Sequence, residues 1–374
     1  MFDGMVRRCF GDFSGIHPTD LQWDQATRGL RFGGLGLRST SSHAAAAYIA
    51  SVGSSLEACA AIDATFSVTA AKAAPPLHQA VAAFNTSIPA TEALSVETAL
   101  ALKQRDLSRH LDIASWNSQL ARSSLVEQAT LRSEAEIGAR AFLVAIPSGA
   151  CHMEGPAFLT ELRARLAIPD ASIDKWCPRC DAVLDAMSHH AAMCAAGEER
   201  TQRHHAVRDA VFKWVERAGL RPEKEPSRIL LPQCPDDTAV SRRRPADVYI
   251  PAMAGGPVAL DFAVTAPQRQ ETLTLAAHTA GAAAAAYAVH KEQHLQTGAE
   301  CHRQGITFMP MVVESTGTWD AAAAKVLKHM AHAAAARSGS APGEFFSALL
   351  QELCVVVRSW RARAVLRRRS EDAA

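Results

Sequence analysis

Four potential metal ligands lie close together near the middle of the chain. They are Cys177, Cys180, His189 and Cys194, with the spacing C-x2-C-x8-H-x4-C. Zinc binds thiolate and imidazole groups tetrahedrally, and a site with four protein ligands is normally structural rather than catalytic. The adjacent His190 is an alternative fourth ligand. The spacing therefore predicts a small module, at roughly residues 170–200, that is held together by one zinc ion.

Two aspartates and a lysine further along the chain form a second candidate site. Asp247 and Asp261 lie fourteen positions apart in two segments rich in β-forming residues, and Lys291 lies in a following helical segment. If the two segments pair, their carboxylates can converge on Mg²⁺, which prefers oxygen ligands. A bound cation activates water and stabilises the leaving oxygen in phosphodiester hydrolysis, and a nearby lysine can orient that water. Solvated acids at strand ends and an exposed lysine are the alternative interpretation.

The composition indicates a soluble globular protein with more than one domain. The chain has 374 residues, of which 48% are hydrophobic and 21% charged, and this length exceeds one average core. No apolar run approaches the ~20 residues that cross a bilayer, and no apolar block follows Arg7 and Arg8. We therefore expect neither a membrane partner nor secretion. Nine cysteines, three of them assigned to zinc, favour a reducing compartment over a disulfide framework.

A formal net charge of +1 hides two clusters of arginines. They are Arg242, Arg243 and Arg244, and Arg367, Arg368 and Arg369. Local basic patches can bind a phosphate backbone even when the whole chain is nearly neutral. Such runs are about as often solvated faces, so the clusters alone do not decide between these roles.

The periodicity of apolar residues predicts an α+β protein. Residues 1 to about 145 show helical periodicity, interrupted by a glycine-rich turn at Gly33 that lacks the full phosphate-binding motifs. We expect a helical, thumb-like and linker region over residues 1–165. We expect a mixed α/β domain over residues 201–335. Its predicted elements are, in order, a helix at Gln202 to Ala218, a hairpin of Asp247 to Ile250 with Val258 to Val264, a helix at Glu271 to Gln296, a strand at Ile306 to Val313 and a helix at Trp319 to Ala336. A basic helix over residues 340–374 closes the chain.

From residue 177 to about 320, the order of these residues resembles a known family. It resembles the C-terminal region of non-LTR retrotransposon proteins, which carry a CCHC zinc knuckle and a restriction-like endonuclease of the PD-(D/E)XK superfamily. The matching segments are Cys177, Cys180, His189 and Cys194; Arg203-His204-His205 with Val207-Arg208-Asp209; Arg244-Pro245-Ala246-Asp247; Leu260-Asp261-Phe262-Ala263-Val264-Thr265; Lys291; and Phe308 to Glu314. Three features depart from the family pattern: Ala246 separates Pro245 from the first acid, Asp261 has no D/E-x-K partner in its strand, and Leu295 replaces an aromatic residue often found after the lysine.

The resemblance implies a role for each matching residue. Asp247 and Asp261 would bind catalytic Mg²⁺, together with the backbone carbonyl of Phe262, and Lys291 would orient the attacking water. Glu225 or Glu314 could supply a further carboxylate through water. A second group of residues would contact nucleic acid: Arg203, His204, Arg242, Arg243 and Arg244.

The N-terminal half resembles the same family at Gln22 to Ala26 and Gly33 to Arg38, which look like the segment after a reverse-transcriptase palm. No aromatic-x-Asp-Asp tetrad is present, so we expect no reverse-transcriptase activity from this chain itself and regard it as the tail of a larger element protein or a truncated copy of one. The resemblance implies a nuclear, Mg²⁺-dependent DNA endonuclease with structural Zn²⁺, DNA as its partner and element RNA as a second one. The alternative is a catalytically decayed, zinc-stapled nucleic-acid-binding module.

Overall fold

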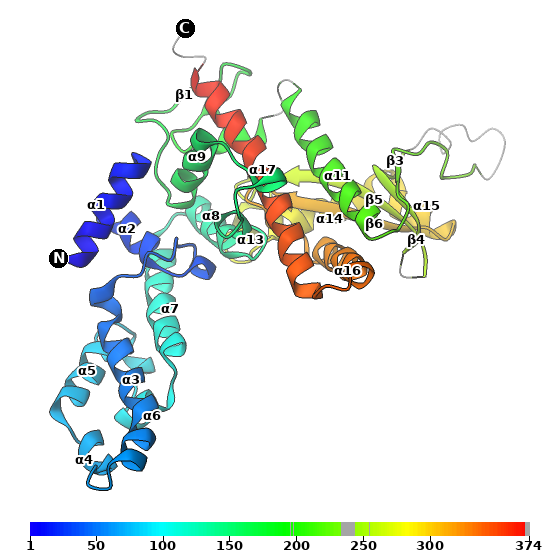
Figure 1. The fold of residues 1–374 in the computed structure, drawn as a ribbon. Helices are drawn as coiled ribbons and strands as arrows, with labels where there is room; N and C mark the ends of the chain where they lie inside the picture. Colours follow the sequence, from blue (N-terminus) through cyan, green and yellow to red (C-terminus); the bar gives the residue numbers. More distant parts are fainter. Residues whose placement is uncertain (195, 197, 233–243, 254, 371–374) are drawn as a thin grey trace. The chain divides into compact units, whose positions relative to one another are not determined.

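The computed structural model describes residues 1–374 except 195, 197, 233–243, 254 and 371–374. The chain divides into two compact units, Met1–Ser123 and Ser124–Ala374 (Figure 1), which are called the N-terminal and C-terminal units below. Helices and a sheet are both present, which confirms the α+β class at this coarse level. The helical region expected over residues 1–165 spans the division, because residues 124–165 belong to the C-terminal unit.

The N-terminal unit is helical. Its elements are α1 (Phe2–Ser14), α2 (Asp20–Thr27), η1 (Leu30–Phe32), α3 (Thr40–Ile62), α4 (Val68–Lys72), α5 (Pro75–Asn85), η2 (Ala90–Glu92), α6 (Val96–Ala101) and α7 (Gln104–Arg122). α3 packs against α5, α6 and α7 around a small core that includes Ile49, Phe84 and Leu107. The glycine-rich turn lies between α2 and α3, and Gly33 has a φ of 72°, a left-handed conformation that glycine adopts without strain.

Helix α3 bears on the expectation that no segment crosses a membrane, but does not decide it. It has 23 residues and is apolar enough, by length and composition alone, to cross a membrane, whereas no such segment was expected. Much of this apolar character comes from alanine, and core helices of soluble proteins meet the same criteria. The helix is therefore weak evidence for a membrane span.

The C-terminal unit contains a four-stranded sheet. Its strands are β3 (Glu223–Lys224), β4 (Val248–Met253), β5 (Gly256–Thr265) and β6 (Thr307–Glu314), and their order is β3-β4-β5-β6. The expected hairpin is present, since β4 and β5 pair antiparallel with Val248 opposite Leu260. β6 pairs with β5 in parallel, with Asp261 opposite Pro310. The short β3 was not expected.

The parallel pairing of β5 and β6 requires a crossover connection. This connection consists of α13 (Leu273–Ala276), α14 (Ala282–Gln293), η5 (His294–Gln296) and α15 (Thr297–Arg303). The prediction of one helix over residues 271–296 is therefore wrong. Gly281, with a φ of 75°, precedes α14, and Leu295 and Gln296 are left-handed at 52° and 54° after it. These conformations interrupt the helix, although the alanine-rich sequence favours helix throughout.

Alternation along β5 determines which side chains meet which helices. Ala263 packs with Ala284 of α14 and Val312 of β6, so the odd-numbered positions of β5, including Asp261, face α14. α11 (Glu199–Arg217) also contacts β5 and packs against α16 (Ala321–Ser338) and α17 (Pro342–Ser370). The site described below lies where α11 and α14 approach this strand.

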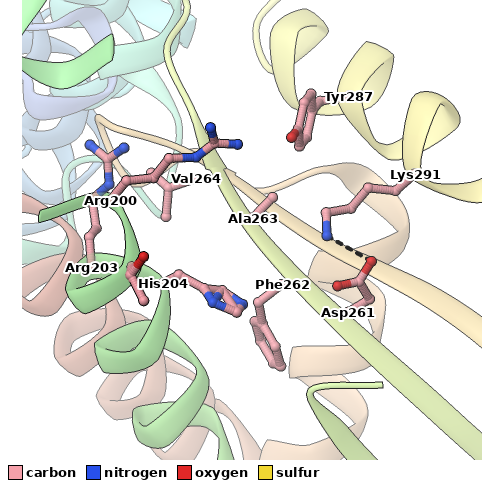
Figure 2. Close-up of a pocket in the computed structure, with 10 residues that line it drawn as sticks. Arg200, Arg203, His204, Asp261, Phe262, Ala263, Val264, Tyr287 and Lys291 are labelled. Carbon is pink, nitrogen blue, oxygen red and sulfur yellow. Dashed lines mark ion pairs between the residues drawn. The ribbon is translucent and has the colours of Figure 1, made fainter. Parts of the chain in front are cut away.

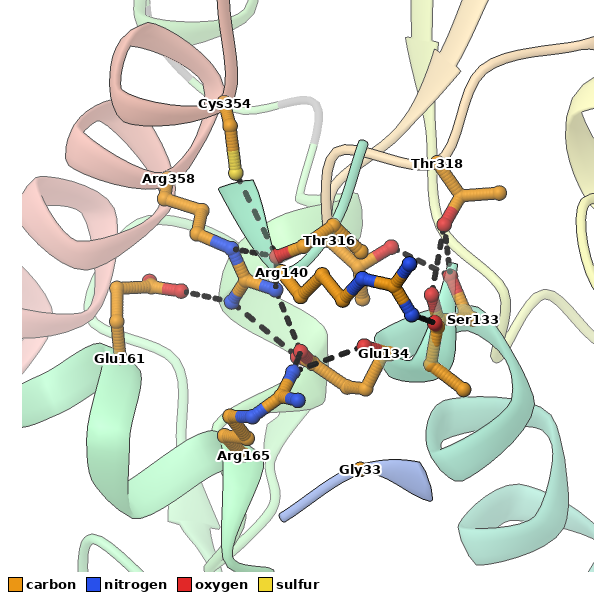
Figure 3. Close-up of polar contacts among 12 residues, drawn as sticks. Gly33, Ser133, Glu134, Arg140, Glu161, Arg165, Thr316, Thr318, Cys354 and Arg358 are labelled. Carbon is orange, nitrogen blue, oxygen red and sulfur yellow. Dashed lines mark hydrogen bonds and ion pairs between the residues drawn. The ribbon is translucent and has the colours of Figure 1, made fainter. Parts of the chain in front are cut away.

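A buried network of charged residues joins α8 (Leu125–Ala135), α9 (Gly155–Arg165) and α17. The Arg358 guanidinium donates to Glu134 of α8 and, at 2.8 Å, to Glu161 of α9. Arg165 donates to Glu134 at 2.9 Å, and the side chains of Arg358, Arg165 and Glu134 are fully buried. Figure 3 shows Arg358 between the two carboxylates. The network explains why residues 124–165 belong with the sheet-containing unit.

Replacing Arg358 with methionine should destabilise the protein by about 3–5 kcal/mol, because the change removes a charged partner from two buried carboxylates. Urea unfolding followed by circular dichroism would measure the loss. Arg363→Met is the matched control, because Arg363 is exposed on the same helix and rests on the ring of Trp360. Equal unfolding midpoints for the two variants would contradict a stabilising role of the network.

Candidate functional site

The cysteines and one histidine form a Cys3His cluster that fits zinc. A hairpin of two short strands, β1 (Lys175–Trp176) and β2 (Val183–Leu184), precedes α10 (His189–Met193). The Cys180 sulfur lies 3.2 Å from His190 Nε2 and 3.7 Å from the Cys194 sulfur, and these atoms and the Cys177 sulfur all lie within 4.8 Å of one another. Two thiolates bound tetrahedrally at ~2.3 Å would be ~3.8 Å apart. The ligand atoms are therefore spaced as a zinc site requires.

The fourth ligand is His190, so the prediction of His189 is corrected in favour of the alternative. His189 Nδ1 lies 3.3 Å from the Asp185 carboxylate, which also accepts from the backbone N–H groups of His189 and His190 at 3.0 and 2.8 Å. Successive residues of a helix point about 100° apart. With His189 directed to Asp185, only His190 faces the sulfurs.

The C-terminal arginines lie behind this cluster. Arg368 is fully buried, donates to Glu199 of α11 at 2.6 Å and interacts with the sulfur of Cys194. Arg367 pairs with Glu199 as well, and Arg369 donates to the Ser188 hydroxyl at 2.7 Å. These contacts join α17, α11 and the zinc module. The basic run at Arg367 to Arg369 therefore mainly makes contacts within the protein.

Asp247 is the last residue before β4, and its position is set by the strand pairing. Its backbone N–H donates to the carbonyl of Leu260 at 2.8 Å. Its Oδ2 accepts from the backbone N–H of Phe262 at 2.7 Å, so the carboxylate continues the hydrogen-bond ladder where β4 has not yet begun. This contact holds the side chain against β5, beside Asp261.

Asp261 meets both Asp247 and Lys291. Its Oδ2 lies 2.7 Å from Lys291 Nζ, and the two carboxyl groups are in hydrogen-bond contact. Burial raises the pKa of Asp261 to about 6; Lys291 opposes this shift and the charge of Asp247 adds to it. The structure thus brings together all three residues proposed for magnesium-dependent chemistry, from β5, α14 and the residue before β4. Figure 2 shows the pairing of Asp261 with Lys291.

His204 lies on the carboxylate pair rather than at a free surface. Its Nε2 is 2.9 Å from Asp247 Oδ2. Burial, together with the nearby His205, Lys291 and Arg208, lowers the pKa of His204 to about 4, so the ring is neutral at pH 7. A neutral imidazole can donate one hydrogen bond to the carboxylate and so orient it.

The other residues predicted for the site have separate environments. Arg203 is buried and donates to the Ala192 carbonyl at 2.9 Å, whereas Arg244 is exposed at the rim of a hollow that includes Lys291. Arg242 and Arg243 lie outside the described residues. Glu225 is exposed and pairs with Arg208, although its backbone N–H donates to the Asp247 carbonyl at 2.9 Å.

Glu314 lies away from the acid pair, fully buried at the end of β6. Its carboxyl group accepts from the hydroxyl of Ser133 and from the backbone N–H of Ala284. Burial raises the pKa of Glu314 to about 7. Its contacts are those of a structural residue that joins β6 to α8 and α14.

A hollow of about 220 Å³ opens over Asp261. Arg200, His204, Asp261, Tyr287 and Lys291 are among the residues that line it (Figure 2). Arg200 and Tyr287 were not predicted from the sequence. Each lies four positions before a predicted site residue on the same helix, His204 and Lys291 respectively, and this spacing places them on the same helix face.

The chain matches no protein-family model and no curated protein.

Loss of His190 should abolish stoichiometric zinc binding, whereas loss of His189 should not. The expected zinc content is one ion per chain for His189→Ala and well below one for His190→Ala, because only His190 reaches the three sulfurs. Atomic emission of the purified variants would measure the metal. Equal zinc contents would contradict the assignment, and a lower melting temperature only for His190→Ala would support a stabilising role for the ion.

Relative to wild type, the Glu314→Gln variant should become more stable as pH rises. The folded-state pKa of Glu314 is about 7, against an ordinary value of 4.5, so the folded state holds a proton that the unfolded state releases. Its contribution to stability is complete below pH 4.5 and is lost between pH 4.5 and 7. Glutamine does not titrate. The free energy of unfolding of the variant should therefore rise by ~3 kcal/mol relative to wild type across this interval, as urea unfolding at several pH values would show; a constant difference would contradict it.

Proposed function

We propose that this protein is a metal-dependent endonuclease that nicks DNA, with a restriction-like core of the kind found in non-LTR retrotransposon proteins. The observation that carries the proposal is the convergence of Asp247, Asp261 and Lys291 from three separate elements. Lys291 Nζ lies 2.7 Å from Asp261, whose carboxyl group contacts that of Asp247. The β4–β5 hairpin brings the two aspartates together, whereas Lys291 comes from α14, 30 positions after Asp261 in the sequence.

The pair of carboxylates is suited to Mg²⁺ or Mn²⁺. The side chains of Asp247 and Asp261 are 18% and 25% exposed, so a hydrated cation can reach them, and two carboxylates with water are the usual ligand set of Mg²⁺. A cation bound there would activate water and stabilise the leaving oxygen. In the reaction, the water oxygen bonds to phosphorus, the P–O bond to one sugar breaks, and the released sugar oxygen gains a proton.

The protein's own residues hold this arrangement in place. The N–H group of Phe262 and the imidazole of His204 fix the orientation of the Asp247 carboxylate. The Lys291 ammonium lies beside the acids, where it can orient the attacking water and balance negative charge on the phosphate. In this function, the Cys3His module holds structural Zn²⁺, nucleic acid is the partner, and the protein acts in the nucleus.

A non-catalytic nucleic-acid-binding module is the second candidate. Both carboxylates already have partners, because Asp247 contacts His204 and Asp261 pairs with Lys291. These contacts satisfy the acids without a cation, as in a site that has lost its activity while the fold persists. Magnesium-dependent cleavage distinguishes the two candidates.

Asp247→Asn and Asp261→Asn should each reduce Mg²⁺-dependent nicking of a supercoiled plasmid at least about 100-fold, because each removes a charged metal ligand. DNA affinity should remain within about threefold of wild type, because phosphate contacts from elsewhere supply most of it. Conversion of supercoiled to open-circular plasmid measures the first quantity and fluorescence anisotropy the second.

Glu216→Gln is the control, because Glu216 is an exposed acid on α11, the helix that carries His204. It should nick at the wild-type rate. Full activity in both aspartate variants would exclude these residues from the site. DNA binding without cleavage by the wild type, at several Mg²⁺ and Mn²⁺ concentrations, would favour the non-catalytic module.

A further inference from the structure

A second hollow, of about 300 Å³, shares Asp261, Tyr287 and Lys291 with the hollow described above. It is called the α14 hollow below, and its other lining residues include Arg244, His290 and His294. The first hollow extends from Asp261 toward Arg200 of α11 (Figure 2). The α14 hollow extends instead toward Arg244 and the C-terminal end of α14. The pair of Asp261 and Lys291 therefore lies where the two hollows meet.

The lining of the α14 hollow suits an anion. Asp261 is its one acid among the described residues, and this carboxylate already pairs with Lys291 at 2.7 Å. Arg244, His290 and His294 are all exposed. Within the part of the chain that the structure describes, their side chains make no hydrogen bond or ion pair. A guanidinium group and imidazole N–H groups can therefore donate to a ligand in this hollow.

The two histidines lie on the face of α14 that carries Lys291. Tyr287, His290 and His294 follow one another at intervals of three and four residues, which places them on one side of the helix. The ring centroids of Tyr287 and His290 lie 5.7 Å apart, as do those of His290 and His294. His294 comes three residues after Lys291, which is roughly 4.5 Å along the helix axis. A group bound by His294 would thus lie beside a phosphate at Lys291 and not in its place.

The position of the α14 hollow favours a phosphate group as its anion. Under the proposed function, the phosphate that is cut lies at Asp261 and Lys291, and its neighbours on the strand are the nearest other anions. The dipole of α14 opposes an anion at the C-terminal end of the helix, because that end carries a partial negative charge. Arg244 carries a full positive charge and can bind a phosphate through paired hydrogen bonds. Its attraction therefore exceeds the opposing effect of the dipole.

We propose that the α14 hollow binds the phosphate next to the one that is cut, on the same DNA strand. Arg244 donates to this phosphate from the segment before β4, and His290 and His294 donate to it from the helix side. The strand then continues past Lys291 over the end of α14, so the cut falls within a strand and not at its terminus. The inference rests on the proposed function, to which it adds the path of the strand beside the acids.

Arg244→Ala, and a double variant with His290→Ala and His294→Ala, remove the proposed contacts and leave the acids in place. Each should raise the KM for a DNA strand about 5- to 10-fold while kcat changes less than about threefold, because the contacts bind the substrate and not the reacting phosphate. The control is a double variant with His329→Ala and His332→Ala, since these histidines are exposed on α16 and line neither hollow. It should leave KM unchanged. A wild-type KM in both of the first variants would overturn the proposal.

Neutral linkages in the substrate identify the phosphate that is contacted. A methylphosphonate replaces one phosphodiester at a time at the positions that flank the mapped cut of an oligonucleotide. For the wild type, the neutral linkage next to the cut on one side should lower kcat/KM about 5- to 10-fold. For Arg244→Ala and the His290/His294 double variant, the same linkage should lower it less than about twofold, because the contact is already lost. Equal losses in wild type and variants would overturn the proposal, since a purely structural change leaves the sensitivity to the linkage intact.

Binding measured without cleavage separates this inference from the nuclease proposal. Anisotropy with a 20-nucleotide single strand, in the Asp247→Asn background and without added Mg²⁺, gives the affinity at several salt concentrations. Arg244→Ala should reduce the magnitude of the slope of log affinity against log salt by about 1, as the loss of one phosphate contact requires. A reduced slope in a protein whose wild type never nicks would support the phosphate site and reject the nuclease. Nicking with an unchanged slope and KM would support the nuclease and reject the phosphate site. Circular dichroism melts of each variant verify that the fold is retained.

Discussion

The rest of the C-terminal unit depends on the burial of one guanidinium group. Arg358 is enclosed between Glu134 and Glu161. If α17 separated from α8 and α9, both carboxylates would lose this charged partner. A buried ion pair adds little net stability relative to apolar packing, but a broken one costs several kcal/mol. The network therefore makes one arrangement of these three helices much more favourable than its alternatives.

The same helix, α17, also connects the two candidate sites of the unit. Further along it, Arg368 contacts Cys194 of the zinc module and Glu199 at the start of α11. α11 in turn carries His204, which lies against Asp247. Polar contacts of Arg368 thus join the Cys3His cluster to the start of α11, and α11 itself leads to the acid pair.

The sequence predicted which strands surround the site better than it predicted where the neighbouring helices begin and end. Alternating β-forming residues identified β4 and β5, and the position of Asp247 at the start of β4 predicted its approach to Asp261. The break after α14 was missed because Leu295 and Gln296 adopt left-handed conformations that no local signal requires. The choice between His189 and His190 depended on Asp185, whose role in orienting α10 becomes apparent only in the folded chain. The burial of Arg358 and Arg368 was also unpredictable, because their carboxylate partners are far away in the sequence.

The interruption at Leu295 has an electrostatic consequence for the lysine of the site. Because α14 ends at Gln293, Lys291 lies in the last turn of the helix. The aligned peptide dipoles give the C-terminal end of a helix a partial negative charge, which attracts cations. If the helix continued without interruption to residue 303, its C-terminal end would lie far from Lys291 and this attraction would be absent. The kink thus converts an ordinary mid-helix side chain into one whose ammonium is attracted both by the peptide dipoles behind it and by the acids in front.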